Sequence, residues 1–147
     1  MADQPENEKD AKPDYLLLIR GNTWRSGMSA QDMQDYTTRW NAWMDGIIKS
    51  GRLKGANPLQ NRGKLIAGKG GQAIMDGPFP ESKEVIGGYF LLDVESEEQA
   101  VEIARACPML DIGMQVEVRP VATSCPLIAH ADMLAKLEQI ASGARKA

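Results

Sequence analysis

The chain has 147 residues, 43% of them apolar and 25% charged, a composition typical of one globular domain that buries its own core. Twenty acidic and 17 basic residues give a net charge of −3, and no basic stretch is interleaved with aromatic residues. Nucleic-acid binding is therefore not expected. The longest apolar runs are too short to cross a bilayer, and the N-terminus has no apolar signal segment. We expect a cytoplasmic protein without a membrane partner.

The first third of the chain predicts a polar tail, a strand and a long helix. Residues 1–14 are rich in charge and proline, which is typical of a disordered tail. Residues 15–20 predict a short strand that is buried on both faces. Ser29 and Asp32 predict the start of a helix that ends before Gly51. Its apolar residues recur at spacings of three and four: Met33, Tyr36, Trp40, Trp43, Ile47 and Ile48.

The middle of the chain predicts strands and turns. Residues 53–59 favour a second strand, and glycine-rich turns surround a hairpin made of residues 64–67 and 72–75. The stretch 63–70 approaches a phosphate-binding loop, but Gly70 stands where a Ser or Thr would hold magnesium, and no long helix follows. We therefore interpret this stretch as a hairpin turn and expect no nucleotide there.

The second half of the chain predicts another strand-helix-strand unit. Residues 85–94 are the strongest strand, in which Gly87-Gly88 indicates a bulge or a close approach to another backbone or a ligand. A capping box at residues 96–99 predicts a helix that Pro108 ends. Residues 114–121 alternate between apolar and polar, as in a half-buried strand. A last helix is predicted after Pro126.

This order of elements predicts an α+β, ferredoxin-like domain over residues 15–122, with a tail at 1–14 and a helical extension at 123–147. Two helices cover only one face of a sheet, yet residues 16–19 and 89–92 place apolar side chains on both faces. We expect a second copy of the chain to cover the other face, forming a homodimeric α+β barrel. The alternative is a monomer in which the C-terminal helix covers that face.

The most specific stretch of the chain is residues 76–84, which read Asp-Gly-Pro-Phe-Pro-Glu-Ser-Lys-Glu. This stretch closely resembles the DGPF signature of the YCII-related (YciI-like) family. Residues 87–94 and 116–121 add to the resemblance. The resemblance implies a ferredoxin-like fold that pairs as a dimer. It also implies small organic ligands, because some relatives act as cofactor-free lyases or dehalogenases on small ring compounds.

The resemblance also bears on catalytic residues. Members closest to the founding branch are thought to use a histidine on the first helix and an aspartate just after the second. Those positions fall on Trp40 and near Cys107 in this chain, so both members of the pair are absent. Asp76 and Glu84 are then the best candidates for catalytic acid or base groups.

Prolines on both sides stiffen the chain around Phe79. Phe79 then either plugs a hydrophobic hole or lets the loop hold its charged ends at a pocket rim. Trp24 and Tyr36 are candidates for the pocket wall, and Trp40 fits either that wall or the core. Three cations are candidates for anchoring an anionic ligand: Arg20, Lys83 and Arg119.

Metal-ligating residues are sparse. The sole histidine, His130, has no cluster of cysteines or carboxylates beside it in the sequence, so neither a metal nor another cofactor is expected. Cys107 and Cys125 are expected to be reduced thiols.

Two functions are compatible with these features. The first is a homodimer that binds a small organic metabolite between the first helix and the sheet and carries out cofactor-free, lyase- or hydrolase-like proton transfer. The second is a non-catalytic ligand-sensing or protein-interaction module linked to transcription regulation. The missing catalytic pair supports it, as does the tendency of the family to occur beside transcription factors.

Overall fold

The computed structural model describes residues 12–21, 27–77, 85–123 and 130–145. Residues 14–121 form one compact unit, and helix α3 belongs to a second. Most of the tail predicted at 1–14 lies outside the described residues. The unit of residues 14–121 contains strands β1 (Tyr15–Arg20), β2 (Leu53–Pro58), β3 (Gly63–Ala67), β4 (Ala73–Gly77), β5 (Ile86–Leu92) and β6 (Gln115–Pro120), helices α1 (Ala30–Lys49) and α2 (Glu97–Arg105), and short 3₁₀ turns η2 (Lys69–Gly71) and η3 (Pro108–Ile112).

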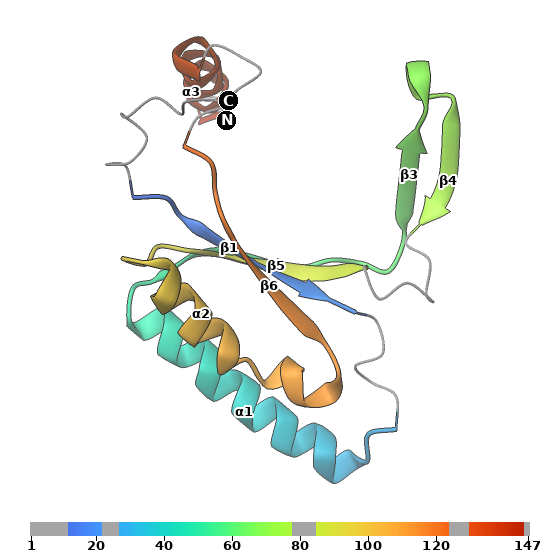
Figure 1. Ribbon diagram of the computed structural model, residues 1–147, viewed down its shortest axis with the longest axis vertical. Coiled ribbons are helices and arrows are strands. Elements are labelled where there is room, and N and C mark those ends of the chain that lie inside the picture. Colours follow the sequence, from blue (N-terminus) through green and yellow to red (C-terminus); the bar gives the residue numbers. More distant parts are fainter. Residues whose placement is uncertain (1–11, 22–26, 78–84, 124–129, 146–147) are drawn as a thin grey trace, which may run out of the picture. The chain divides into compact units, whose positions relative to one another are not determined.

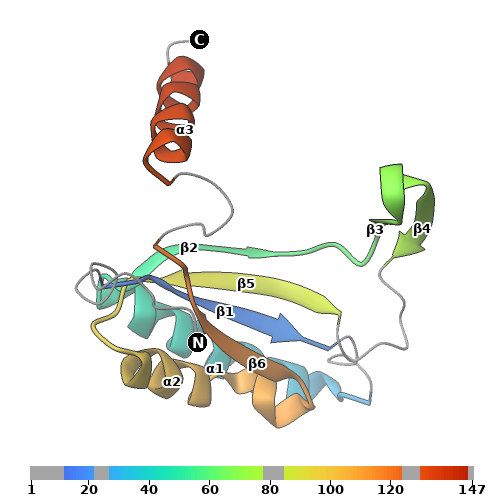
Figure 2. The same ribbon diagram turned by 45° about the horizontal axis from the view of Figure 1, so that its top comes forward.

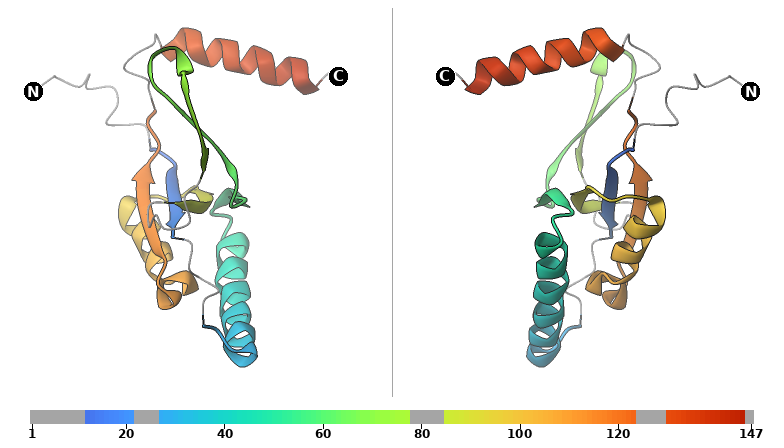
Figure 3. Two further views of the ribbon diagram at one scale, coloured as in Figure 1. Left: turned by 90° about the vertical axis from the view of Figure 1, so that its right-hand side faces the viewer. Right: turned by 90° about the vertical axis from the view of Figure 1, so that its left-hand side faces the viewer.

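Four of the strands form an antiparallel sheet in the order β2-β5-β1-β6. Helices α1 and α2 lie side by side on one face of this sheet (Figures 1 and 2). Both views of Figure 3 show β1, in blue, next to β6, in orange, although they are the first and last strands of the unit. The strand order and the two helices on one face confirm the predicted ferredoxin-like α+β fold.

The core lies between the sheet and the helices. Along β1, Tyr15, Leu17 and Ile19 are buried, whereas the residues between them are half-exposed on the opposite face. Leu17 sits opposite Phe90 of β5 on one side and Val118 of β6 on the other. Because side chains of a strand alternate between faces, this strand contributes its odd-numbered residues to the core.

Helix α1 begins and ends as the sequence predicts. The Ser29 Oγ accepts a hydrogen bond from the Asp32 amide, and an Asp32 carboxylate oxygen accepts one from the Ser29 amide, both at 3.1 Å. Hydrogen bonding of the Asp32 carboxylate to the Ser29 side chain, and then to the Ser29 backbone amide, lowers the pKa of Asp32. At the other end Gly51 has a φ of 73°, and its amide donates to the Ile48 carbonyl at 3.1 Å.

The apolar face predicted for α1 is wrong at one position. Ile47 is 5% exposed, but Ile48 is 55% exposed. Neighbouring residues of an α-helix point about 100° apart, so only one of two adjacent isoleucines can face the sheet. Met44, three residues before Ile47, packs against the core instead.

The Gly87-Gly88 pair forms a bulge and also allows the close approach of another backbone, two of the features that its sequence indicates. Ile19 pairs with Gly88 and Arg20 with Ile86, so Gly87 is the extra residue of a bulge. A Cβ atom on Gly88 would lie 3.1 Å from the Asn57 carbonyl oxygen on β2. Glycine at this position therefore lets β2 approach β5 closely.

Strands β3 and β4 form the predicted hairpin as a separate two-stranded sheet. Its four large apolar side chains are exposed, and they occupy both faces. Leu65 is opposite Met75, and Ile66 is opposite Ile74 on the other face, with exposed fractions from 41% to 63%. A two-stranded hairpin of this kind gains little stability by itself in water.

Helix α3 (His130–Arg145) confirms the predicted last helix in the second unit. Leu137 and Ile140 are 52% and 68% exposed. Cys125 lies outside the described residues. None of the helices in the described ranges is long and apolar enough to cross a membrane.

Candidate functional site

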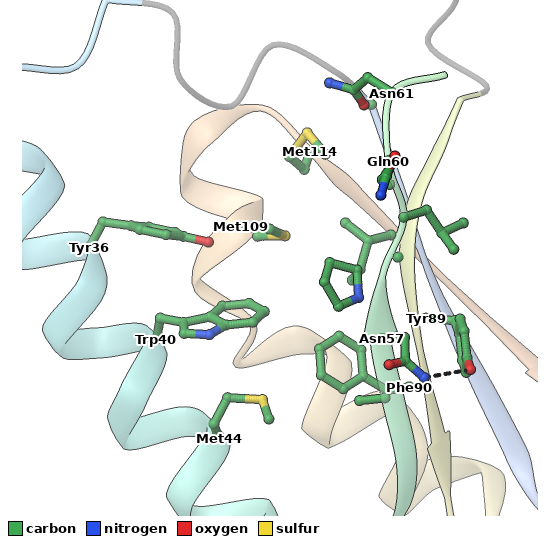
Figure 4. Close-up of a pocket in the computed structure, with 17 residues that line it drawn as sticks. Tyr36, Trp40, Met44, Asn57, Gln60, Asn61, Tyr89, Phe90, Met109 and Met114 are labelled. Atoms are coloured by element: carbon green, nitrogen blue, oxygen red, sulfur yellow. Dashed lines mark hydrogen bonds between the residues drawn. The ribbon is translucent and has the colours of Figure 1, made fainter. Parts of the chain in front are cut away.

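A pocket of about 870 Å³ lies between α1, η3 and the edge of the sheet formed by β2 and β5. Figure 4 shows side chains of α1 facing those of β2 and β5 across it. The volume is within the range of small-molecule sites, roughly 300–1,000 Å³. The pocket is lined by Ile19, Gly21, Tyr36, Trp40, Met44, Ala56, Asn57, Pro58, Leu59, Gln60, Asn61, Gly87, Gly88, Tyr89, Phe90, Met109 and Met114.

An aromatic cluster forms one wall of the pocket. The Trp40 ring centroid lies 6.2 Å from that of Tyr36, 5.3 Å from that of Trp43 and 5.9 Å from that of Phe90. Trp43 is fixed in the core because its Nε1 donates to the Ile103 carbonyl of α2 at 2.9 Å. Trp40 both packs against the core and lines the pocket, so the two readings of this residue are compatible.

The hydroxyl of Tyr36 is the most unusual polar group of this site. Tyr36 is 6% exposed, and no hydrogen-bond partner for its hydroxyl exists among the described residues. Burial, and secondarily the nearby Cys107 thiol, raises the pKa of Tyr36 to about 12. The hydroxyl is therefore protonated at neutral pH and can donate a hydrogen bond.

Amide residues of β2 and of the segment after it border the pocket. The Asn57 Nδ2 donates to the Tyr89 hydroxyl at 2.9 Å, the bond drawn in Figure 4, on the face of the sheet away from α1, because these two residues alternate with the core residues Ala56 and Phe90. Gln60 and Asn61 follow β2 and also line the pocket, and the Gln60 Oε1 accepts from Arg62 at 2.8 Å. The site thus combines an apolar body and one deep hydroxyl with the amides of Gln60 and Asn61, which are neutral groups of the kind that orient a ligand.

Asp76 lies on β4, outside the group of residues that line the pocket. Its side chain is 87% exposed and forms an ion pair with Lys64 across the hairpin. Trp24, Lys83 and Glu84 lie outside the described residues. Among the predicted pocket residues in the described ranges, the structure therefore brings Tyr36 and Trp40 to the pocket.

The predicted anion-binding cations Arg20 and Arg119 belong to the other face of the sheet. Arg20 follows the pocket-lining Ile19 along β1 and so points away from the pocket. The Arg20 Nε lies 2.7 Å from the Glu117 Oε2, and the Arg119 Nε lies 3.8 Å from the Glu117 Oε1. Both cations share one carboxylate on this face.

Several lining residues were missed by sequence reasoning. Met44 carries a signal in the sequence, because it is four residues after Trp40 and eight after Tyr36, on the same helix face. Asn57 and Met109 carry none, because their approach to α1 depends on strand pairing and on the turn after α2.

The described ranges contain no group of three His, Cys, Asp or Glu side chains that could hold a metal ion. Cys107 is a free, buried thiol, and burial raises its pKa. A thiol in this state is a poor nucleophile, because the thiolate is the reactive form.

Comparison with known proteins gives a family but no activity. The sequence profile of the YCII-related domain matches residues 29–123. No curated protein shows a significant match. A solved structure of 5-chloro-2-hydroxyhydroquinone dehydrochlorinase from Burkholderia phenoliruptrix AC1100, in complex with 2,5-dihydroxybenzoquinone, aligns with a TM-score of 0.41 and 18% identity, covering 72% of this chain and 90% of that one. Because the family profile spans well over half of the sequence, this protein belongs to the YCII-related domain family.

Proposed function

We propose that this protein is a cytoplasmic homodimer that binds a small organic metabolite in the pocket between α1 and the sheet. The observation that carries this proposal is an aromatic wall beside the buried Tyr36 hydroxyl, which has no hydrogen-bond partner among the described residues, in one pocket of suitable volume. Apolar walls with a few polar groups are the usual composition of small-molecule sites.

Proton transfer is the chemistry proposed for this pocket if the bound molecule is converted. A pKa of about 12 keeps the Tyr36 hydroxyl protonated at neutral pH, so it can donate a hydrogen bond to a bound molecule but cannot serve as the base. A base must then come from another group, and Asp76 and Glu84 remain the candidates. Asp76 would have to exchange its ion pair with Lys64 for contact with the ligand. Non-catalytic ligand sensing requires no such group, and the exposed, ion-paired Asp76 favours it.

Methionine methyl signals provide a test of binding. Met44, Met109 and Met114 line the pocket, whereas Met33 on α1 does not. We expect a ligand found in a thermal-shift screen of metabolites to shift the NMR signals of the three lining methyl groups and to leave Met33 unchanged. A ligand that shifts Met33 but none of the lining methionines would place binding elsewhere and contradict the proposal.

The same samples separate an enzyme from a sensing module. An enzyme converts the ligand, and the NMR spectrum then shows product signals that grow with time. A sensing module returns the ligand unchanged after prolonged incubation.

The proposed dimer is supported by the sheet face that the helices leave uncovered. Leu16, Leu18 and Leu91 point to this face, because they alternate with the buried Leu17 and Leu92. The exposed apolar hairpin formed by β3 and β4 adds surface that a second copy can cover. A symmetric pair of sheets buries the same apolar patch of both chains.

We expect wild-type protein to have the mass of a dimer in size-exclusion chromatography with light scattering at micromolar concentration. Leu18→Glu should produce the monomer, because two carboxylates would be buried in the apolar interface. Ile48→Glu is the matched control and should remain dimeric, since Ile48 is exposed on α1. A monomeric wild-type protein, or a dimeric Leu18→Glu variant, would contradict pairing through this face.

A further inference from the structure

We infer that Tyr36 selects the ligand: its hydroxyl donates to an uncharged oxygen, a carbonyl or hydroxyl group, on the end of an otherwise apolar molecule. This inference rests on the proposed function, since it describes the chemistry of the molecule bound in the same pocket. It adds that the part of the ligand next to α1 is polar and carries no charge.

Tyr36 lines the pocket, and its hydroxyl is enclosed just behind the wall, so a ligand oxygen reaches it when the adjoining side chains move aside. Figure 4 shows the Tyr36 side chain extending from α1 toward Met109, with the hydroxyl on the pocket side of the ring. Only 6% of the Tyr36 surface is exposed, yet the described part of the chain provides no acceptor for its hydroxyl. A buried donor without an acceptor destabilises the folded state, and nearly all such groups in proteins have partners.

A ligand oxygen at this position removes that unfavourable energy. Trp40, Met44 and Met109 also line the pocket, and each presents an apolar surface. A neutral oxygen loses little hydration on entering such surroundings and gains one hydrogen bond. An ionised group would lose far more hydration than one hydroxyl returns.

The charged and titratable groups that the structure describes near Tyr36 do not alter this preference. Arg39, one turn along α1, pairs with Asp111 at 2.5 Å, and both side chains are more than half exposed. The Cys107 thiol is buried, and burial keeps it in the neutral form. Neither group supplies a buried positive charge that would favour an anionic ligand.

Three probes of similar size separate the contributions of oxygen and charge. Acetophenone carries a neutral carbonyl, ethylbenzene has no oxygen, and benzoate is anionic at neutral pH. Each is titrated into the full-length protein while the methyl signals of Met44, Met109 and Met114 are followed by NMR. We expect acetophenone to bind about tenfold more tightly than ethylbenzene, because this ratio of affinities corresponds to one net hydrogen bond to a buried donor. Benzoate should bind at least tenfold more weakly than acetophenone.

The Tyr36→Phe variant is the matched control, because it removes the hydroxyl and keeps the ring. Its affinities for acetophenone and ethylbenzene should agree within about twofold. A merely structural role of the hydroxyl would change both affinities in parallel and leave their ratio unaltered. The variant is expected to fold, since the removed hydroxyl has no partner in the described residues.

The outcomes distinguish this inference from the function on which it rests. If the lining methionines respond to no probe in either protein, the pocket does not take small organic molecules and both proposals fail. If acetophenone and ethylbenzene bind wild-type protein equally, or if Tyr36→Phe retains the tenfold ratio, the pocket binds ligands but Tyr36 does not select them. Benzoate binding as tightly as acetophenone would overturn the preference for a neutral group.

Discussion

Replacing Leu17 by alanine is expected to destabilise the folded protein by about 2–5 kcal/mol, enough to remove much of the stability of an ordinary domain. Leu17 is 0% exposed and lies on β1, one of the two inner strands of the sheet. Its cross-strand neighbours are Phe90 and Val118. Loss of its side chain leaves a cavity that these two strands cannot fill without disturbing their pairing. The free energy of unfolding therefore falls both because less apolar surface is buried and because the cavity stays unfilled.

Urea denaturation followed by circular dichroism, at one fixed protein concentration, measures this effect. Leu137→Ala is the control, because Leu137 is 52% exposed on α3 and its truncation should change the free energy of unfolding by less than about 0.5 kcal/mol. A Leu17→Ala variant as stable as the control would show that β1 is not central to the core.

Replacing Trp40 by alanine should have the second large effect, because this residue belongs to both the core and the pocket. Its ring contacts those of Tyr36, Trp43 and Phe90. We expect a loss of about 3 kcal/mol in stability and a loss of ligand affinity of roughly thirtyfold or more, as for a buried aromatic residue at the centre of a site.

Two conservative variants separate packing from binding. Trp40→Phe should keep most of the affinity measured for acetophenone, because an aromatic ring remains in the wall. Trp43→Phe should reduce stability, since the bond from Nε1 to the Ile103 carbonyl is lost, while leaving affinity within about threefold. If Trp40→Ala remained folded and bound acetophenone as wild type does, Trp40 would have no part in the site.

Secondary structure was well predicted because its signals are local. The capping box at Ser29 and Asp32, the positive φ at Gly51 and the glycine-rich hairpin turn all act over a few residues. The error at Ile48 has the same origin. Spacing along a helix identifies an apolar face, but the edge of that face depends on how the helix rotates against the sheet.

Roles in a site were harder to predict, because they depend on contacts between distant parts of the chain. The sequence suggested that Asp76 lies at a pocket rim and that Arg20 anchors an anionic ligand. In the fold, Asp76 faces Lys64 across the hairpin and Arg20 faces Glu117 across the strands β1 and β6. Each pairing follows from strand register, which brings together residues 12 and 97 positions apart.

The sequence by itself determined the elements, the ferredoxin-like order of strands and helices, and membership of the YCII-related family. Only the tertiary structure decided that the hydroxyl of Tyr36, one of several apolar-face residues of α1, is buried without a hydrogen-bond partner among the described residues. The physical reason is that amphipathic spacing is a property of one helix, whereas burial of a hydroxyl without a partner depends on what the sheet and η3 place opposite it.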